Sequence, residues 1–276
     1  MPGHRTDPSD SGQQLLLTLG RLVDQALERI KLQQARAELA MALQRHMLPP
    51  GLPQLPGVHI AARYAPSRDG LDVGGDWYDA FLMMDGSLGL TIGDVQGHDV
   101  EAIAFMGQVR TSLRAIAEAT SDPREVLSRT NDLLISMGFG LFATCCFLRF
   151  DPVSRDLTVS RAGHVPMVWA TAGGRSGIAL DRGGPPLGVL AGERYPVTHR
   201  RLTEAGVLVL LTDGVVEGPT YPMEAGLAEV ARLVRAGFDA DSDVLASAVI
   251  KVAEQTGHRD DAAVLVVRYD GPPEPG

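Results

Sequence analysis

The segment from residue 76 to residue 95 constrains the fold most, because it pairs with itself in one satisfactory register. Two runs of strand composition, residues 76–83 and 87–95, flank a three-residue loop that ends at Gly86. With Gly86 in the left-handed conformation, a hairpin with this loop places apolar residues opposite each other along one face. It also places Asp76 opposite Asp94. A two-residue loop instead leaves neither face apolar, so we predict the first register.

Two carboxylates therefore end the apolar ladder, with Cβ atoms about 4.5–5.5 Å apart. Ionised carboxylates repel each other, so such a pair either shares a proton or holds cations. Carboxylate oxygen is the preferred ligand of Mg²⁺ and Mn²⁺, and the sequence lacks the Cys and His spacing that is typical of zinc sites. We favour a divalent cation site over the alternative, in which the two aspartates are surface turn residues.

Two further groups of aspartates flank apolar strands. Asp213-Gly214 follows the apolar run at 207–211, and Asp260-Asp261 precedes another at 262–267. A strand delivers a carboxylate to a fixed place at its end, and Gly214 lets the chain turn away. Each group alone is a weak signal, because Asp-Gly is also a common turn sequence.

The N-terminal part reads as one long helix over residues 13–48, which a cluster of four prolines from Pro49 to Pro56 ends. Leu16, Val23 and Ile30 recur every seven residues, which resembles the seam of a dimerising coiled coil or signalling linker over 13–47 and fades after Ile30. The alternative is a helix that packs on its own domain. We expect disorder over 1–12 and 271–276, and a folded domain over 49–270.

The rest of the chain alternates short strands with pairs of helices, which is typical of an α+β domain. A meander is predicted for 142–150, 156–161 and 165–171. Asp122, Pro123 and Glu125 resemble an N-cap, a first helical position and a capping-box residue. The other predicted strands are 58–65, 207–211 and 262–269, and the predicted helices are 99–118, 122–137, 224–235 and 242–255.

The composition excludes several classes of function. With 25 Lys and Arg against 34 Asp and Glu, the net charge is −9. The field of such a chain repels nucleic acid and anionic membranes. Cys145 and Cys146 are adjacent in an apolar run, so they point to opposite faces of a strand and form no disulfide framework. No signal peptide or membrane span is recognisable, and we expect a cytoplasmic protein.

Six motifs resemble, in their order, those of metal-dependent PPM-type (PP2C-like) protein phosphatases, most closely the bacterial SpoIIE/RsbU-like branch. The resemblance extends over residues 44–270. The motifs are Gly74-Gly-Asp-Trp-Tyr-Asp79, Gly93-Asp-Val-Gln-Gly-His98, Ala162-Gly-His164, Gly184-Pro-Pro-Leu-Gly188, Leu211-Thr-Asp-Gly-Val215 with Glu217, and Asp260-Asp261.

The resemblance implies a four-layer α/β/β/α sandwich with a site for two Mn²⁺ or Mg²⁺ ions at one end. Asp76 would bridge the ions, and Asp94 would be a ligand together with the carbonyl of Val95. Asp213 and Asp260 would hold one of the metals, although the adjacent Asp261 is an alternative to Asp260. Asp76 and Asp94 are thus also the candidate catalytic residues, and water activated by the metals would attack the phosphoryl group.

The roles of the histidines are less specific. His98 either donates a proton to the leaving oxygen or caps the helix that follows it. His164 is expected to shape the loop near the site through hydrogen bonds, with direct catalysis as the alternative. Asp99 stands where the family usually has glycine, and it is either a helix N-cap or a charge that tunes the metals.

The implied function is hydrolysis of phosphoserine or phosphothreonine on a protein. By analogy with its branch, the substrate would be an anti-sigma-factor antagonist of the STAS type. Two alternatives stay open at this point. One is a non-catalytic signalling module that works by partner binding, and the other is a small-molecule phosphohydrolase.

Overall fold

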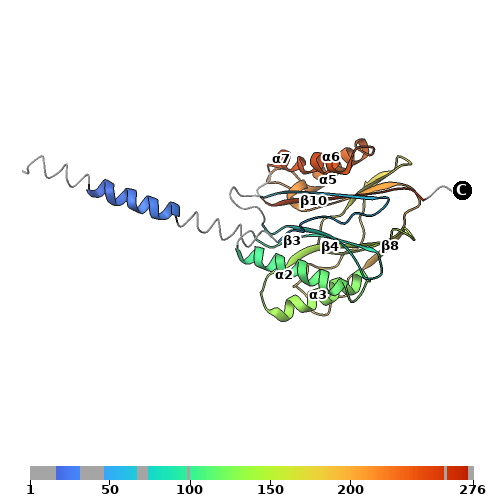
Figure 1. Ribbon diagram of the computed structural model, residues 1–276, viewed down its shortest axis with the longest axis horizontal. Coiled ribbons are helices and arrows are strands. Elements are labelled where there is room, and N and C mark those ends of the chain that lie inside the picture. The colour runs from blue at the N-terminus through green and yellow to red at the C-terminus, as the bar shows by residue number, and fades with distance from the viewer. Residues whose placement is uncertain (1–16, 32–46, 67–73, 98–99, 258–259, 273–276) are drawn as a thin grey trace, which may run out of the picture. The chain divides into compact units, whose positions relative to one another are not determined.

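The computed structural model describes residues 17–31, 47–66, 74–97, 100–257 and 260–272 (Figure 1). The chain forms two compact units, Met1–Leu43 and Gln44–Gly276. In the first unit, residues 17–31 are helical. All other helices and strands of the described residues belong to the second unit. None of the described helices combines the length and the apolar character that crossing a membrane requires.

Two five-stranded antiparallel sheets form the centre of the second unit. The first sheet has the order β1 (Val58–Ala65), β10 (Ala262–Tyr269), β9 (Gly206–Leu211), β6 (Val168–Thr171) and β7 (Ser176–Ile178). The second sheet has the order β2 (Trp77–Leu82), β3 (Leu88–Val95), β4 (Ala143–Phe150), β5 (Asp156–Ala162) and β8 (Val197–Arg201).

Helices cover the outer face of each sheet (Figure 1). The first sheet carries α5 (Met223–Ala236) and α6 (Ser242–Ile250), and the second carries α2 (Val100–Ala117) and α3 (Pro123–Met137). Two short helices, α4 (Asp213–Val216) and α7 (Val252–Thr256), lie next to each other beside the first sheet. The predicted α+β sandwich of four layers is therefore confirmed.

The β2–β3 hairpin has the predicted register. Tyr78 pairs with Ile92, and Gly86 has a φ of 80° in the loop. Beyond the strand ends, the Val95 N–H donates to the Gly75 carbonyl at 3.3 Å, so the pairing continues past the two aspartates. The register predicted from the three-residue loop is therefore confirmed, and it places Asp76 beside Asp94.

Strand alternation divides the core into layers. Leu90 and Ile92 of β3 pack between the sheets with Leu208 and Leu210 of β9. The residues that alternate with them face the helices instead, as Trp77 does towards α2. Because Asp94 is two residues after Ile92, it belongs to the face between the sheets.

The two cysteines confirm the same alternation. Cys145 packs on the helix side of the second sheet and Cys146 packs between the sheets. Both thiols are free and buried.

The predicted meander is wrong in its third strand. The segment at 165–171 leaves the second sheet after Gly163, whose φ is 64°, and its strand β6 pairs with β9 and β7 in the first sheet. Composition does not reveal this crossing, because an apolar strand fits either sheet. The edge strands β7 and β8 were not predicted, since both are short and only partly buried.

Two helix predictions need correction. The predicted helix at 242–255 is two helices, because the Lys251 N–H donates to the Val249 carbonyl and interrupts the regular ladder. At α3, Asp122 caps the helix by accepting from the Arg124 N–H at 3.0 Å. Glu125 does not complete a capping box, because its carboxylate accepts from the hydroxyl of Thr120 at 2.6 Å.

Candidate functional site

Five aspartates gather where the two sheets end on the same side. Asp76 directly precedes β2 and Asp94 lies in β3, both in the second sheet. Asp213 follows β9, and Asp260 and Asp261 precede β10, in the first sheet. We call these five residues the acidic cluster. Each lies at a strand end, where the backbone fixes the start of the side chain.

The Gly74-Gly75 turn brings the chain onto Asp261. A Cβ atom on Gly74 would lie 1.7 Å from Oδ2 of Asp261, which leaves room for glycine alone. The Gly75 N–H donates to the same oxygen at 2.9 Å. A Cβ atom on Gly75 would lie 2.8 Å from the carbonyl oxygen of Val95, so this carbonyl also faces the turn.

The adjacent aspartates Asp260 and Asp261 have different environments. Asp261 is 3% exposed and its carboxylate holds the turn at Gly75, whereas Asp260 is exposed. Oδ1 of Asp260 accepts from the N–H of Asp261 at 2.9 Å. Asp260 therefore has the side chain that is open to an added ligand, and Asp261 has a structural contact.

Thr212 links the first sheet to Asp76. Its hydroxyl donates to Oδ2 of Asp76 at 2.7 Å and accepts from the Ala263 N–H at 2.8 Å. Thr212 occupies the N-cap position of α4, but its side chain makes no capping bond there. A residue type that normally caps helices thus serves the acidic cluster. Sequence reasoning missed this role, although Thr212 lies inside one of the recognised motifs.

Tyr64 of β1 is a second contact that was not predicted. Its hydroxyl oxygen accepts from the Gly74 N–H at 2.8 Å. Burial, together with the nearby charges of Asp76 and Asp261, raises the pKa of Tyr64 well above its usual value. The hydroxyl therefore stays protonated and neutral beside the carboxylates.

His164 joins the two sheets behind the cluster. Its Nδ1 lies 2.8 Å from the hydroxyl oxygen of Thr144 in β4, and its Nε2 lies 3.1 Å from the carbonyl oxygen of Leu211 in β9. The side chain is 3% exposed, and burial lowers its pKa to about 3. The hydrogen-bonded position near the site that was expected for His164 is therefore present.

The electrostatics of the cluster favour a bound cation. Burial and the charges of Asp213 and Asp260 raise the pKa of Asp94 to about 8. Burial and the charge of Asp94 raise the pKa of Asp76, and burial and Asp260 raise that of Asp213. Nearby negative charge thus makes Asp76, Asp94 and Asp213 harder to ionise, and a divalent cation relieves this repulsion.

In the part of the chain that the structure describes, no three Asp, Glu, His or Cys side chains meet as a ready-made set of metal ligands. Repulsion opposes a closer approach of the carboxylates, so we expect the cluster to tighten when a cation neutralises it. The oxygen-only chemistry of the cluster, with a carbonyl of Val95 beside it, fits Mg²⁺ or Mn²⁺.

Other candidate residues lie elsewhere. Asp79 faces the helix side of the second sheet, where Arg110 of α2 donates to it at 3.0 Å. His98 and Asp99 lie outside the described residues, so their expected roles stay predictions. Cys145 and Cys146 are buried strand thiols whose pKa burial raises, and a thiol of raised pKa is a poor nucleophile.

Comparison with known proteins gives a consistent result. The family model described as Stage II sporulation protein E (SpoIIE) matches residues 84–270, which is more than half of the chain. Protein IcfG of Synechocystis sp. is 27% identical over 276 residues, covering 90% of this chain and 42% of IcfG. Phosphoserine phosphatase RsbU of Bacillus subtilis is 24% identical over 181 residues, covering 65% of this chain and 53% of RsbU.

Among solved structures, the RsbU and RsbW domains of Rv1364c from Mycobacterium tuberculosis are similar, with a TM-score of 0.75 and 33% identity. That similarity covers 83% of this chain and 64% of the other. The chain thus spans about half the length of the curated relatives that it matches.

Proposed function

The chain belongs to the Stage II sporulation protein E (SpoIIE) family, in the PPM-type branch that includes RsbU, and we propose that it is a Mn²⁺- or Mg²⁺-dependent protein phosphatase. It would hydrolyse phosphoserine or phosphothreonine on a protein. The observation that carries this proposal is the acidic cluster, in which burial and the charge of Asp213 from the first sheet raise the pKa of Asp94 in the second.

Four aspartates would hold the ions. Asp76 would bridge two of them. Asp94 would bind an ion together with the Val95 carbonyl, and Asp213 and Asp260 would both bind one of the ions. When bound, the ions supply an activated water and neutralise the phosphoryl oxygens. Asp261 supports the site instead, because its carboxylate is engaged by the Gly75 N–H.

The chain itself would fix the position of the carboxylates and supply a candidate proton donor. Thr212 and the Gly74-Gly75 turn fix the carboxylates without adding bulk. The neutral hydroxyl of Tyr64 holds the same turn, because its oxygen accepts from the Gly74 N–H. His98 remains our candidate for protonating the leaving oxygen, with helix capping as its alternative role.

The substrate we propose is a phosphorylated anti-sigma-factor antagonist of the STAS type. The support is the similarity to RsbU and the resemblance of the motifs to that branch, and the acidic net charge makes nucleic acid and anionic membranes unfavourable partners. The cytoplasmic location expected from the sequence stays a prediction.

We also propose that the chain forms a homodimer through residues 13–47. In the described helix at 17–31, large apolar side chains are exposed, among them Val23, Leu27 and Ile30 at 49–52%. Two copies would bury this stripe against each other. Light scattering should give a dimer mass for the full chain and a monomer mass for residues 44–276. Monomer masses for both would contradict the dimer.

The phosphatase proposal is tested by hydrolysis of p-nitrophenyl phosphate and of a phosphoserine peptide over a manganese titration. We expect metal-dependent turnover that Asp76→Asn and Asp213→Asn each reduce by more than about 100-fold. Asp156→Asn, which changes a half-exposed carboxylate on β5, is the matched control and should keep full activity. Absence of metal-dependent turnover on either substrate would favour the non-catalytic signalling module.

A further inference from the structure

The acidic cluster is divided between the two sheets. Asp76 and Asp94 are fixed to the second sheet, whereas Asp213 and Asp260 are fixed to the first. Apolar packing holds facing sheets at roughly 10 Å but defines their separation at a polar end only loosely. The distance between the two halves of the cluster therefore depends on the polar contacts that cross from one sheet to the other.

His164 makes such a crossing with both ring nitrogens. It lies in the connection between β5 of the second sheet and β6 of the first. The Leu211 carbonyl can only accept, so Nε2 of His164 carries the hydrogen. Burial keeps the ring neutral, which leaves Nδ1 without hydrogen to accept from the hydroxyl of Thr144. The imidazole is thus held in one tautomer and one orientation.

Both partners of this bridge adjoin the cluster. Thr144 pairs with Asp94 in the register of β3 and β4. Leu211 precedes Thr212, which holds Asp76, and Asp213 follows directly. A shift of the imidazole would therefore move the two halves of the cluster relative to each other.

We propose that His164 is a positioning residue that, together with Thr144, sets the separation of the two halves of the acidic cluster and so the affinity of the site for divalent cations. The proposal rests on the proposed function, since it needs the cluster to bind such ions. Residues that orient ligands in this way typically change metal affinity 10–100-fold when they are replaced.

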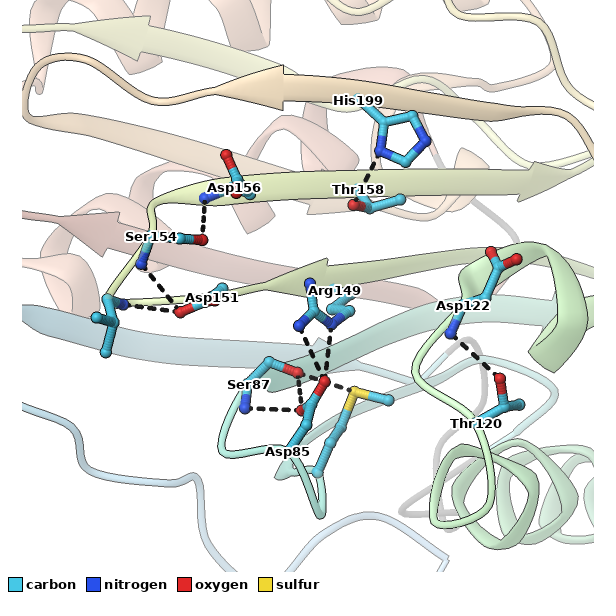
Figure 2. A network of polar contacts seen from close by, with 12 residues as sticks. Asp85, Ser87, Thr120, Asp122, Arg149, Asp151, Ser154, Asp156, Thr158 and His199 are labelled. Carbon is cyan, nitrogen blue, oxygen red and sulfur yellow. Dashed lines mark hydrogen bonds and ion pairs between the residues drawn. The ribbon is translucent and has the colours of Figure 1, made fainter.

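The protein contains a matched control pair of the same residue types. Thr158 of β5 and His199 of β8 lie 3.4 Å apart, from hydroxyl oxygen to Nδ1 (Figure 2). They face each other in the register of the second sheet. Because both belong to one sheet, this pair does not fix the distance between the sheets.

The experiment measures manganese binding by isothermal titration calorimetry on the full chain. We expect Thr144→Val and His164→Gln each to raise the manganese dissociation constant by about 10-fold or more. The double variant should bind about as well as the weaker-binding single variant, because both changes break one bridge. Thr144→Ser keeps the hydroxyl and should bind within about twofold of the unchanged protein.

Thr158→Val and His199→Gln should leave the dissociation constant unchanged, and the melting temperature of every variant is measured alongside. If Thr144→Val does not fold, the comparison of Thr144→Ser with His164→Asn, which cannot reach Leu211, takes its place. Unchanged binding in the folded bridge variants, with a normal loss of binding in Asp213→Asn, overturns the positioning role alone. No manganese uptake by the unchanged protein overturns the proposed function, and the positioning role with it.

Discussion

Thr212 donates its hydroxyl hydrogen to Oδ2 of Asp76 across 2.7 Å, from the end of one sheet to the start of a strand in the other. The hydroxyl oxygen of Thr212 also accepts from the Ala263 N–H at 2.8 Å, so one buried hydroxyl serves three elements. In this arrangement the Thr212 side chain makes no capping hydrogen bond to helix α4. Local helix preference yields here to the geometry of the site, as is common where function constrains a fold.

Replacing Thr212 tests this contact. Thr212→Val leaves the Ala263 N–H and the Asp76 carboxyl without this partner in a buried place, so we expect the free energy of unfolding to fall by about 1–3 kcal/mol. Thr212→Ser keeps the hydroxyl and should lose less than about 1 kcal/mol. Urea unfolding measures both. Thr198→Val in β8 is the control, and an equal effect at Thr198 and Thr212 would contradict the assigned role.

The close approach of Gly74 to Asp261 predicts that a larger residue at position 74 destabilises the fold. Because a Cβ atom there would lie 1.7 Å from Oδ2 of Asp261, Gly74→Ala must displace that carboxylate and break its contact with Gly75. We expect a loss of about 1–3 kcal/mol in the free energy of unfolding. Gly51→Ala, which meets no atom within 4 Å, is the matched control.

The double variant Gly74→Ala/Asp261→Ala identifies the clashing group. If the carboxylate is the obstacle, the two changes should cost less together than the sum of their separate costs, by about 1 kcal/mol or more. Strict additivity would show that the alanine methyl group collides with something else.

Short-range geometry makes part of this fold predictable. The β2–β3 register follows from one loop and one apolar ladder, so the pairing of Asp76 with Asp94 can be deduced from local sequence alone. The position of β6 cannot be deduced in this way. Its apolar sequence would fit either sheet, and its pairing with β9 depends on the tertiary structure. The N-cap at Asp122 was predicted correctly, but the partner of Glu125 was not.

The contacts that support the site join residues far apart in the chain. Thr212 lies 136 positions from Asp76, and Asp261 lies 186 positions from Gly75. No local pattern encodes such a pair, and a threonine before an aspartate reads as an ordinary helix cap. The motif resemblance supplied the carboxylates but assigned no contacts to Tyr64 or Thr144.

His164 also gives the protein a specific dependence on pH. Its folded-state pKa is about 3 and its usual value is 6.5, so between these values the unfolded chain binds the extra proton. Stability contributed by the neutral ring is therefore lost as pH falls below about 6.5. Relative to His164→Gln, the free energy of unfolding should fall by about 1.4 kcal/mol per pH unit below that point.

Urea unfolding from pH 7 to pH 4 measures this difference for both proteins. His199→Gln provides the comparison, because the imidazole of His199 is exposed. If the difference between the unchanged protein and His164→Gln does not vary with pH, the ring is not held neutral.

A separate prediction concerns Asp85 at the tip of the β2–β3 hairpin. This tip lies at the far end of the second sheet from the acidic cluster. Burial acts to raise the pKa of Asp85, but hydrogen bonds from Ser87 and Arg149 outweigh it and hold the pKa well below its usual value (Figure 2). Ser87→Ala removes the hydroxyl donor and keeps the N–H donor. We therefore expect the pKa of Asp85 to rise towards 3.8, measured by NMR titration of its carboxyl carbon.

The neighbouring β4–β5 turn supplies the control for this titration. A hydrogen bond from Ser154, with a further one from Arg201, lowers the pKa of Asp156. Ser154→Ala should then raise the pKa of Asp156 and leave Asp85 unchanged, while Ser87→Ala should do the reverse. Because both carboxylates have a lowered pKa, each contributes stability that is lost as pH falls below about 4. A shift at both aspartates in either variant would mean that the two turns are coupled through the sheet, instead of each being held by its own serine.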